Sequence, residues 1–383
     1  MLLESIEAHN FRNLSGKIFW GPGLNIIYGN NGQGKTNWLE AIHTLARTKS
    51  FRTQHLQESI RFNSELATIR GRVAYGGDIH RELQIALHGN TKSFSINGKR
   101  EPLSQYLDQL YVVALTADEL EVIRGTPDAR RRFIDRGAAS LQPSYVQTIA
   151  DYSRVIKQKN RILQDALDRE LRLAETEDLI SPWNTQLVGL AGKIHRARVE
   201  YVEGLNQALE CRVFGQERIL IRYVSSLEGK GDLNDYEGLI RERLRLRLRT
   251  EVAAGHSLIG PHRDELAILF EGREMRVYGS AGQQRSALLL LDLAAISLYN
   301  SRRDDYPLFL VDDVDAELDE KRINSLLEYL EGRTQTFITT SKRSHLGKFI
   351  SGANVYEIKN GAALASGAKT QFIPSLLATA EGA

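Results

Sequence analysis

One eight-residue segment constrains the fold of this chain more than any other part of the sequence. It consists of Gly29, Asn30, Asn31, Gly32, Gln33, Gly34, Lys35 and Thr36. The segment matches the pattern G-x-x-x-x-G-K-[ST] without a mismatch, and the apolar run Leu24–Tyr28 before it is typical of a buried strand. Because apolar residues at helical spacing follow in Thr36–Arg47, the order of strand, loop and helix predicts a phosphate-binding loop. A glycine-rich turn without a chemical role is the alternative.

The residue types in this loop suit phosphate binding. Glycines let the backbone N–H groups surround a phosphate chain at the N-terminus of a helix. We expect Lys35 to reach the β- and γ-phosphates and the Thr36 hydroxyl to bind Mg²⁺.

The metal partner of such a loop is a carboxylate at the end of a buried strand. The run Pro307–Val311 predicts this strand, and Asp312 and Asp313 follow it directly. Two adjacent carboxylates are costly to bury without a cation. We therefore expect Asp312 to hold Mg²⁺ through water and Asp313 to orient or activate the attacking water. A strand that runs into a polar turn is the alternative.

The distance between the two motifs indicates how the chain is organised. Lys35 and Asp312 lie 277 residues apart, so distant parts of the chain must complete one sheet. Between them, residues 128–208 carry helical apolar stripes with few glycines, and we expect helices there with a break near Ser181-Pro182. A further buried strand is predicted at Thr336–Thr339. The fold class is therefore α/β with an inserted, mainly helical segment.

Composition excludes several classes of protein. A hydrophobic fraction of 42% over 383 residues excludes global disorder and predicts two or three domains. The net charge of +2 excludes a histone-like polycation. The single Cys211 cannot form an internal disulfide, which fits a reducing compartment. Because there is no signal-peptide pattern and the longest apolar stretch, Ala287–Leu298, is too short to span a bilayer, we expect a cytoplasmic protein without a membrane partner.

Three further motifs give the order found in one protein family. Phe11-Arg12-Asn13-Leu14 precedes the phosphate-binding loop, and Gly260-Pro261-His262-Arg263-Asp264 precedes the acidic strand. A turn that opens a helix lies between that motif and the acidic strand, and we call it the signature segment: Ser280, Ala281, Gly282, Gln283, Gln284 and Arg285. The Ser-x-Gly-Gln turn is typical of ABC-type ATPases. Together these motifs resemble the RecF family of bacterial recombinational-repair proteins, relatives of the SMC ATPases, over essentially the whole chain. Taken alone, the turn also fits simple helix capping.

The resemblance implies a fold and an activity. The fold is an ABC-type ATPase head, a P-loop NTPase fold, assembled from residues 1–122 and 253–383, with a helical lobe inserted at 123–252. The implied protein binds ATP and Mg²⁺, dimerises around the nucleotide, binds DNA and is a weak, DNA-stimulated ATPase. It helps to load RecA at gapped DNA with RecR and RecO, maintains replication forks and contributes to SOS induction. Ser280 and Gly282 of one subunit then contact the γ-phosphate bound by the other.

The resemblance also assigns roles to single residues. Arg12 and Asn13 match the segment beside the nucleotide, and Asp319 lies in the loop that contacts the second subunit. Asp313 stands where most ABC ATPases carry Glu, which implies slow turnover. A hydroxyl, from Thr340 or Ser341, replaces the switch histidine of that fold. No glutamine that senses the γ-phosphate follows the strand Tyr111–Leu115.

Two arginine clusters are candidates for DNA binding. The first is Arg130, Arg131 and Arg132; it either contacts phosphates or pairs within its helix, for example Asp128 with Arg132. The second consists of alternating residues: Arg241, Arg243, Arg245, Arg247 and Arg249. Their spacing fits a strand with a cationic face or a helix, and the resemblance favours the helix. They either contact DNA phosphates or form a solvated surface whose charge is offset by nearby acidic residues. His262 and Arg263 form a possible acid–base group with Asp264, or are structural.

Three other functions fit the sequence less well. The ATPase subunit of a transporter has its motifs within a much shorter segment. An SMC-type chromosome organiser requires long heptad arms, which residues 123–252 do not contain. A nuclease fused to an ATPase head requires a second cluster of metal-binding carboxylates.

Overall fold

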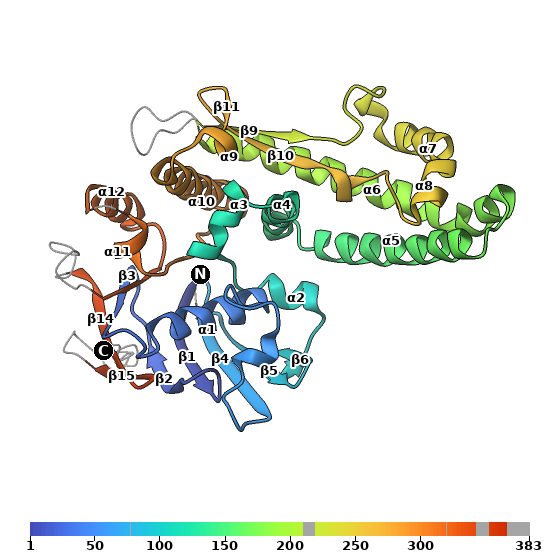
Figure 1. Cartoon of the computed structure of the whole chain (residues 1–383). Coiled ribbons are helices and arrows are strands. Elements are labelled where there is room, and N and C mark those ends of the chain that lie inside the picture. The colour runs from blue at the N-terminus through green and yellow to red at the C-terminus, as the bar shows by residue number, and fades with distance from the viewer. Residues whose placement is uncertain (77, 210–218, 319, 342–351, 366–383) are drawn as a thin grey trace, which may run out of the picture.

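The computed structural model describes residues 1–76, 78–209, 219–318, 320–341 and 352–365. Two compact sheets form one end of the molecule, and long helices extend from it as a lobe (Figure 1). Within the described ranges, no helix combines the length and the apolar character needed to cross a bilayer. Cys211 lies outside these ranges.

A six-stranded sheet joins the two ends of the chain. Its order is β15-β14-β3-β13-β12-β8, with the strands β3 (Leu24–Tyr28), β8 (Val112–Leu115), β12 (Leu308–Val311), β13 (Thr336–Thr340), β14 (Asn354–Lys359) and β15 (Ala362–Ala365). All pairs are parallel except β14 with β15. The strands predicted at 24–28, 307–311 and 336–339 are confirmed, and so is the prediction that both chain ends share one sheet.

A second, antiparallel sheet is built from N-terminal residues alone. Its order is β2-β1-β4-β5-β6-β7, with the strands β1 (Leu2–His9), β2 (Ser15–Phe19), β4 (Leu66–Ala74), β5 (His80–His88), β6 (Thr91–Ile96) and β7 (Lys99–Arg100). Helix α1 (Lys35–Arg47) contacts both sheets. Between β6 and β7, Asn97 and Gly98 both have positive φ, which is the conformation of a two-residue hairpin turn.

The lobe consists of long helices and a small sheet. Helices α4 (Pro127–Leu141), α5 (Tyr145–Asp168) and α6 (Leu173–Leu209) are followed by β9 (Ile219–Val224), α7 (Tyr236–Leu246) and α8 (Leu248–Ala254). The predicted break near Ser181-Pro182 is wrong, because α6 continues through Pro182. Pro182 is exposed, so the carbonyl that loses its helical donor can bind water, while buried Ile180 and Leu187 keep the helix packed.

The remaining elements connect the lobe to the sheets. They are α2 (Leu103–Leu107), α3 (Glu121–Arg124), β10 (Glu265–Phe270), β11 (Arg273–Glu274), α9 (Met275–Tyr278), α10 (Ala281–Arg303), α11 (Val314–Glu317) and α12 (Glu320–Leu330), with the 3₁₀ turns η1 (Leu56–Ser59), η2 (Ala117–Leu120), η3 (Leu233–Asp235) and η4 (Pro261–Arg263). Strand β10 pairs with β9, across the expected boundary at residues 252 and 253. The proposed domain boundaries remain a prediction, and the strand pairing does not follow them there.

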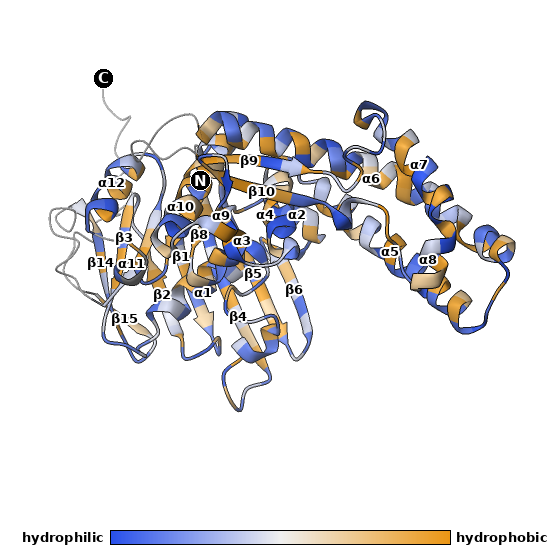
Figure 2. Ribbon diagram, turned by 45° about the horizontal axis from the view of Figure 1, so that its top comes forward, coloured by the Kyte–Doolittle hydropathy of each residue, from blue (hydrophilic) through white to orange (hydrophobic). Residues whose placement is uncertain are grey.

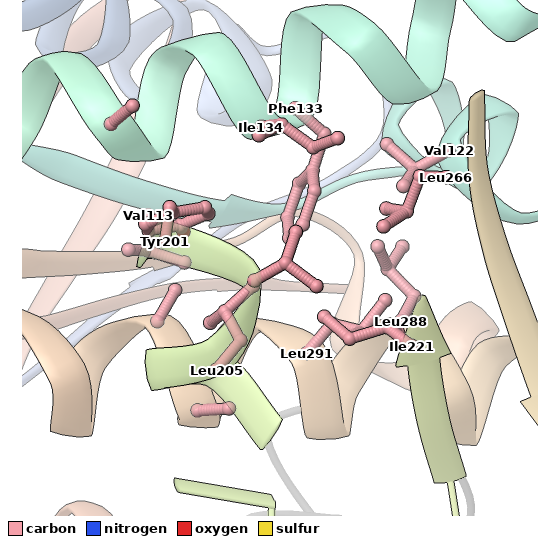
Figure 3. Packing of buried hydrophobic residues seen from close by; sticks show 14 of the residues in the cluster. Val113, Val122, Phe133, Ile134, Tyr201, Leu205, Ile221, Leu266, Leu288 and Leu291 are labelled. Atoms are coloured by element: carbon pink, nitrogen blue, oxygen red, sulfur yellow. The ribbon is translucent and has the colours of Figure 1, made fainter. Parts of the chain in front are cut away.

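The central sheet separates two hydrophobic cores. Leu308 and Leu310 of β12 pack into the core beneath the antiparallel sheet, whereas Phe309 and Val311 pack into the core of the lobe. In this second core, α4, α6 and α10 meet through Phe133, Tyr201, Leu205 and Leu291, among others (Figure 3). Hydrophobic residues recur along the long helices of the lobe (Figure 2), where Val155 and Leu187 still belong to this core and Leu163, Ile180 and Leu248 form a separate small cluster. The junction of sheet and lobe is therefore continuously packed.

Candidate nucleotide-binding site

The phosphate-binding loop connects β3 to α1. Gly34 caps α1 with a φ of 106°, and a Cβ there would lie 2.8 Å from Asn13 Oδ1, so both the conformation and the space require glycine. Lys35 Nζ donates to the Gly29 carbonyl at 2.7 Å and to the Asn30 carbonyl at 3.0 Å. Burial lowers the pKa of Lys35, and Asp313, Asp312 and Asp315 oppose this. The lysine thus lies folded over its own loop.

The acidic strand places its first carboxylate against the loop. Asp312 Oδ1 accepts hydrogen bonds from Thr36 Oγ1 at 2.9 Å and from Thr339 Oγ1 at 2.7 Å. Burial raises the pKa of Asp312, and these two hydrogen bonds oppose the rise. A hydroxyl and a buried carboxylate are oxygen ligands of the kind that Mg²⁺ prefers, so Thr36 and Asp312 fit the expected metal.

Asp313 has a different environment. It is exposed, has a φ of 49° and stands immediately before α11. Its backbone N–H donates to Thr339 Oγ1 at 2.7 Å. A single hydroxyl, that of Thr339, therefore contacts both members of the aspartate pair.

A polar network continues the site beyond α1. Arg12 makes a bidentate ion pair with Glu40, and Arg52 donates to Asn37 Oδ1 at 2.7 Å. Asn37 in turn donates to Asn13 Oδ1 at 2.7 Å. Arg12 and Asn13, predicted beside the nucleotide, therefore belong to one hydrogen-bonded group that also includes Arg52.

These groups surround a cavity of about 560 Å³, which we call the nucleotide cavity. Its lining is entirely polar or glycine: Arg12, Asn13, Asn31, Gly32, Gly34, Lys35, Thr36, Asn37, Arg52, Asp313 and Thr339. Of the other predicted loop residues, Gly29 and Asn30 contribute carbonyls to Lys35. Gln33 turns away, since its side-chain oxygen accepts from the Asn360 backbone N–H. The cavity is suited to a hydrated, highly charged group.

The signature segment lies outside this cavity. Ser280 caps α10 in a reciprocal capping box with Gln283: its Oγ accepts from the Gln283 N–H at 3.3 Å, and Gln283 Oε1 accepts from the Ser280 N–H at 2.8 Å. Within one chain, Ser280 therefore acts as a helix cap, as the alternative interpretation of this turn predicts. Ser280, Ala281 and Gly282 are exposed, and among the described residues none from 279 to 285 lines the nucleotide cavity.

Thr340 and Ser341, one of which is expected to replace the switch histidine, both contact Asp315, and that replacement stays a prediction. Thr340 is buried and donates to Asp315, and exposed Ser341 donates its backbone N–H to the same carboxylate at 3.2 Å. Neither residue lines the cavity, whereas Thr339 does. Alternation along β13 turns Thr339 and Thr340 to opposite faces, which separates Thr340 from the cavity. Asp319, the expected dimer contact, lies outside the described residues.

The basic triplet is mostly structural. Arg130 is buried and makes a bidentate ion pair with Glu265, at 2.6 and 2.7 Å. Arg131 donates to the Asp264 carbonyl at 2.6 Å and pairs with Asp128, the acid expected to pair with Arg132. Arg130 and Arg131 therefore join α4 to β10, which is the structural alternative; only Arg132 is exposed, and a DNA role for the triplet stays a prediction.

The alternating arginines are helical. They lie on α7, on α8 and at the junction between these helices, at the end of the lobe far from the antiparallel sheet (Figure 1). Arg243 donates to the Lys230 carbonyl. The other four are exposed, and none forms an ion pair within the described part of the chain: Arg241, Arg245, Arg247 and Arg249.

His262 and Asp264 belong to a buried structural network. Asp264 accepts from Tyr223 and from the Ser226 N–H, and the His262 ring contacts Tyr152 Oη at 2.7 Å. Burial lowers the pKa of His262 to about 4, so the ring is neutral near pH 7. The acid–base interpretation is therefore replaced by a structural one.

Sequence reasoning missed three polar residues of the site. Thr339 was expected only as part of a strand, and neither Asn37 nor Arg52 belongs to a recognised motif. Asn37 directly follows Thr36, and this adjacency was the available signal. No sequence signal marked Arg52, because its position depends on how residues 48–55 return to α1.

The fold and the site together define a class, the ABC-type ATPase head with an inserted helical lobe. A family model described as "RecF/RecN/SMC N terminal domain" matches residues 2–363. The "DNA replication and repair protein RecF" of Geobacillus kaustophilus is 34% identical over 374 residues, covering 95% of this chain and 100% of that protein. The protein of the same name from Staphylococcus epidermidis is 35% identical, covering 94% and 99%. The chain belongs to the RecF family.

Solved structures agree with this assignment. The recombination mediator protein RecF with ATP, in the RecFOR pathway, matches with a TM-score of 0.86 and 28% identity, covering 95% of this chain and 97% of that one. An SMC head bound to the C-winged helix domain of ScpA matches with a TM-score of 0.53 and 16% identity, a likeness of fold alone.

Proposed function

We propose that this chain binds ATP with Mg²⁺ and that two copies then enclose the nucleotides between them. One observation carries the proposal: the nucleotide cavity and the signature segment are both exposed, but they do not meet within one chain. The N-terminus of α10 presents N–H groups and a positive helix dipole, which suit the terminal phosphate of a partner-bound nucleotide. The solved RecF–ATP structure supports ATP as the nucleotide.

In the proposed site, each group has a task. Lys35 moves from its loop carbonyls to the phosphates, and Thr36 and Asp312 hold the metal. The metal neutralises charge on the phosphates. Asp313 orients the attacking water, and Thr339 holds Asp313 and Asp312 in register. Hydrolysis removes the contacts that join the two copies, so it resets the dimer.

Sedimentation velocity tests this proposal. The dimer fraction is expected to rise with ATP·Mg²⁺, but not with ADP·Mg²⁺ or without nucleotide. Lys35→Ala and Ser280→Arg should both abolish the rise, the first through nucleotide binding and the second through the interface. Ser301→Arg, at an exposed position near the other end of α10, serves as the matched control. One unchanging mass under all conditions would contradict the proposal.

We further propose that DNA is the partner and that its phosphates are contacted by the four exposed arginines of the α7–α8 segment that form no ion pair with any described residue. Arginines without intramolecular ion pairs retain their positive potential toward solvent, and phosphate contacts of this kind give little sequence preference. The relatives are named DNA replication and repair proteins, which supports a chromosomal, and hence cytoplasmic, role in repair. We also propose RecO and RecR as functional partners, with RecA loading and SOS induction downstream; the solved relative is described as a recombination mediator in the RecFOR pathway, which supports a role of this kind.

The salt dependence of DNA binding tests the arginine surface. Replacing Arg241, Arg245, Arg247 and Arg249 by Gln should reduce the slope of log K against log salt by about 3.6, because each contact with a duplex phosphate contributes about 0.9. The control replaces four exposed arginines that do form ion pairs: Arg124, Arg154, Arg222 and Arg302. Titrations should use single strands, duplexes and gapped DNA, with ATP or ADP. A slope equal to that of the control would place the DNA surface elsewhere.

A further inference from the structure

Glu40 is a fully buried carboxylate on the helix that follows the phosphate-binding loop. Its Oε1 accepts from Arg12 at 2.7 Å, from Ser50 Oγ at 2.6 Å and from Ser59 Oγ at 3.3 Å. Its Oε2 accepts from Arg12 Nε at 3.0 Å, and Arg52 lies 3.6 Å away. A buried carboxylate with this many donors is fixed in place, and it fixes the groups that donate to it.

Both arginines bonded or adjacent to Glu40 line the nucleotide cavity. The Arg52 side chain is 45% exposed and is also held by Asn37, whereas Arg12 is 20% exposed and donates through a second nitrogen to the Glu58 carbonyl. One carboxylate between two guanidinium groups leaves a net positive charge beside the cavity. Water can solvate the half-exposed Arg52, so its charge does not require a buried counter-ion. Neutralisation of buried charge therefore does not explain why Glu40 lies beside Arg52.

We propose that Glu40 is a positioning residue, which holds Arg12 and Arg52 against the phosphate chain of the bound nucleotide. This inference rests on the proposed nucleotide binding and specifies how the cavity recognises its ligand. Among the residues that the structure describes, the cavity lining contains no apolar or aromatic side chain on which a base could stack. The planar, forked guanidinium group instead matches phosphate oxygens.

Glu40→Gln tests the role, because the amide keeps the shape but removes the charge. The affinity for ATP, measured by calorimetry on the full chain, is expected to fall about tenfold. Inorganic triphosphate, measured as a competitor of ATP, should lose affinity by the same factor. Glu58→Gln is the matched control, since the Glu58 carboxylate accepts from Thr53 and not from either arginine. Unchanged affinity in Glu40→Gln would overturn the proposal. An ATP loss without a triphosphate loss would also overturn it, because the contact would then be to the base or the sugar.

A double-mutant cycle separates positioning from a merely structural role. The double replacement Arg12→Gln/Arg52→Gln should weaken ATP binding, and adding Glu40→Gln to it should weaken binding by much less than Glu40→Gln does alone, because both arginines that Glu40 orients are then missing. Losses that multiply would overturn the proposal. If Glu40→Gln does not fold, Glu40→Asp keeps the charge one methylene further back and should show the same pattern. If Lys35→Ala binds ATP as tightly as the unmodified chain does, the proposed nucleotide site is wrong. If Lys35→Ala loses ATP binding but the Glu40 variants keep it, only the role proposed for Glu40 is wrong.

Discussion

At the scale of single residues, Thr339 is the most informative member of the site. Its hydroxyl donates to Asp312 Oδ1 and accepts from the Asp313 N–H, so the two aspartates keep a fixed relation. Asp313 has a positive φ, which is uncommon for a residue other than glycine and requires support from its surroundings. One hydroxyl thus orients both the metal-binding and the water-orienting position of the proposed mechanism.

We therefore expect Thr339→Val to slow ATP hydrolysis at least tenfold while ATP affinity changes less than threefold. Valine preserves the shape but provides neither hydrogen bond, and such bonds contribute about 1–2 kcal/mol each. Steady-state kinetics with a separate binding titration measure the two effects. Thr336→Val, at a buried position of the same strand whose hydroxyl contacts Thr334, is the control. Equal losses in both variants would show that Thr339 is only structural.

At the scale of secondary-structure elements, three helices meet around one buried acid. Glu119 of η2 makes a bidentate ion pair with Arg136 of α4 and a single contact with Arg47 of α1, and Asp292 of α10 is buried nearby. Burial raises the pKa of Glu119, but the ion pairs with Arg136 and Arg47 outweigh burial and lower the pKa to about 2. Glu119 thus ties the helix of the phosphate-binding loop to the lobe electrostatically.

Glu119→Gln is expected to lower the free energy of unfolding by about 3 kcal/mol, because the largely buried Arg47 and the partly exposed Arg136 would lose their counter-charge. Urea denaturation at pH 7 measures this change. Glu121→Gln is a close control, since Glu121 is exposed and pairs with Arg124, and it should cost less than about 0.5 kcal/mol. Similar values for the two variants would mean that the buried cluster does not hold the helices together.

The sequence predicted local elements better than it predicted their partners. Strands such as 24–28 and 307–311 were predictable because unbroken apolar runs mark buried parallel strands. The course of α6 through Pro182 was not, since its solvent-facing position is set by packing against α5. Likewise, Gln33 belongs to a perfect motif, yet residues 360–361 hold it, and local pattern carries no information on such long-range contacts.

At the scale of the whole molecule, the proposed sites each need two chains, which makes complementation possible. Lys35→Ala and Ser280→Arg should each be inactive alone, but a mixed dimer contains one site with an intact loop and an intact signature segment. Because neither variant is expected to dimerise with itself, only mixed dimers should form, and an equimolar mixture should recover at most about half of the ATPase rate of the unmodified chain, since one of the two symmetry-related sites is intact. A mixture as inactive as its components would mean that the signature segment does not act across the interface.

The pairing of β3 also has a consequence for folding during translation. This strand, at residues 24–28, hydrogen-bonds only with β13 and β14 among the described strands, and these begin about 300 residues later. At ribosomal rates of about 5–20 residues per second, β3 waits roughly 15–60 s before either neighbour is synthesised. Until then, the backbone N–H and C=O groups on both edges of β3 have no strand partner and can pair with other nascent chains. We therefore expect the N-terminal sheet or a chaperone to cover β3 of the nascent chain and to prevent its aggregation until translation is almost finished.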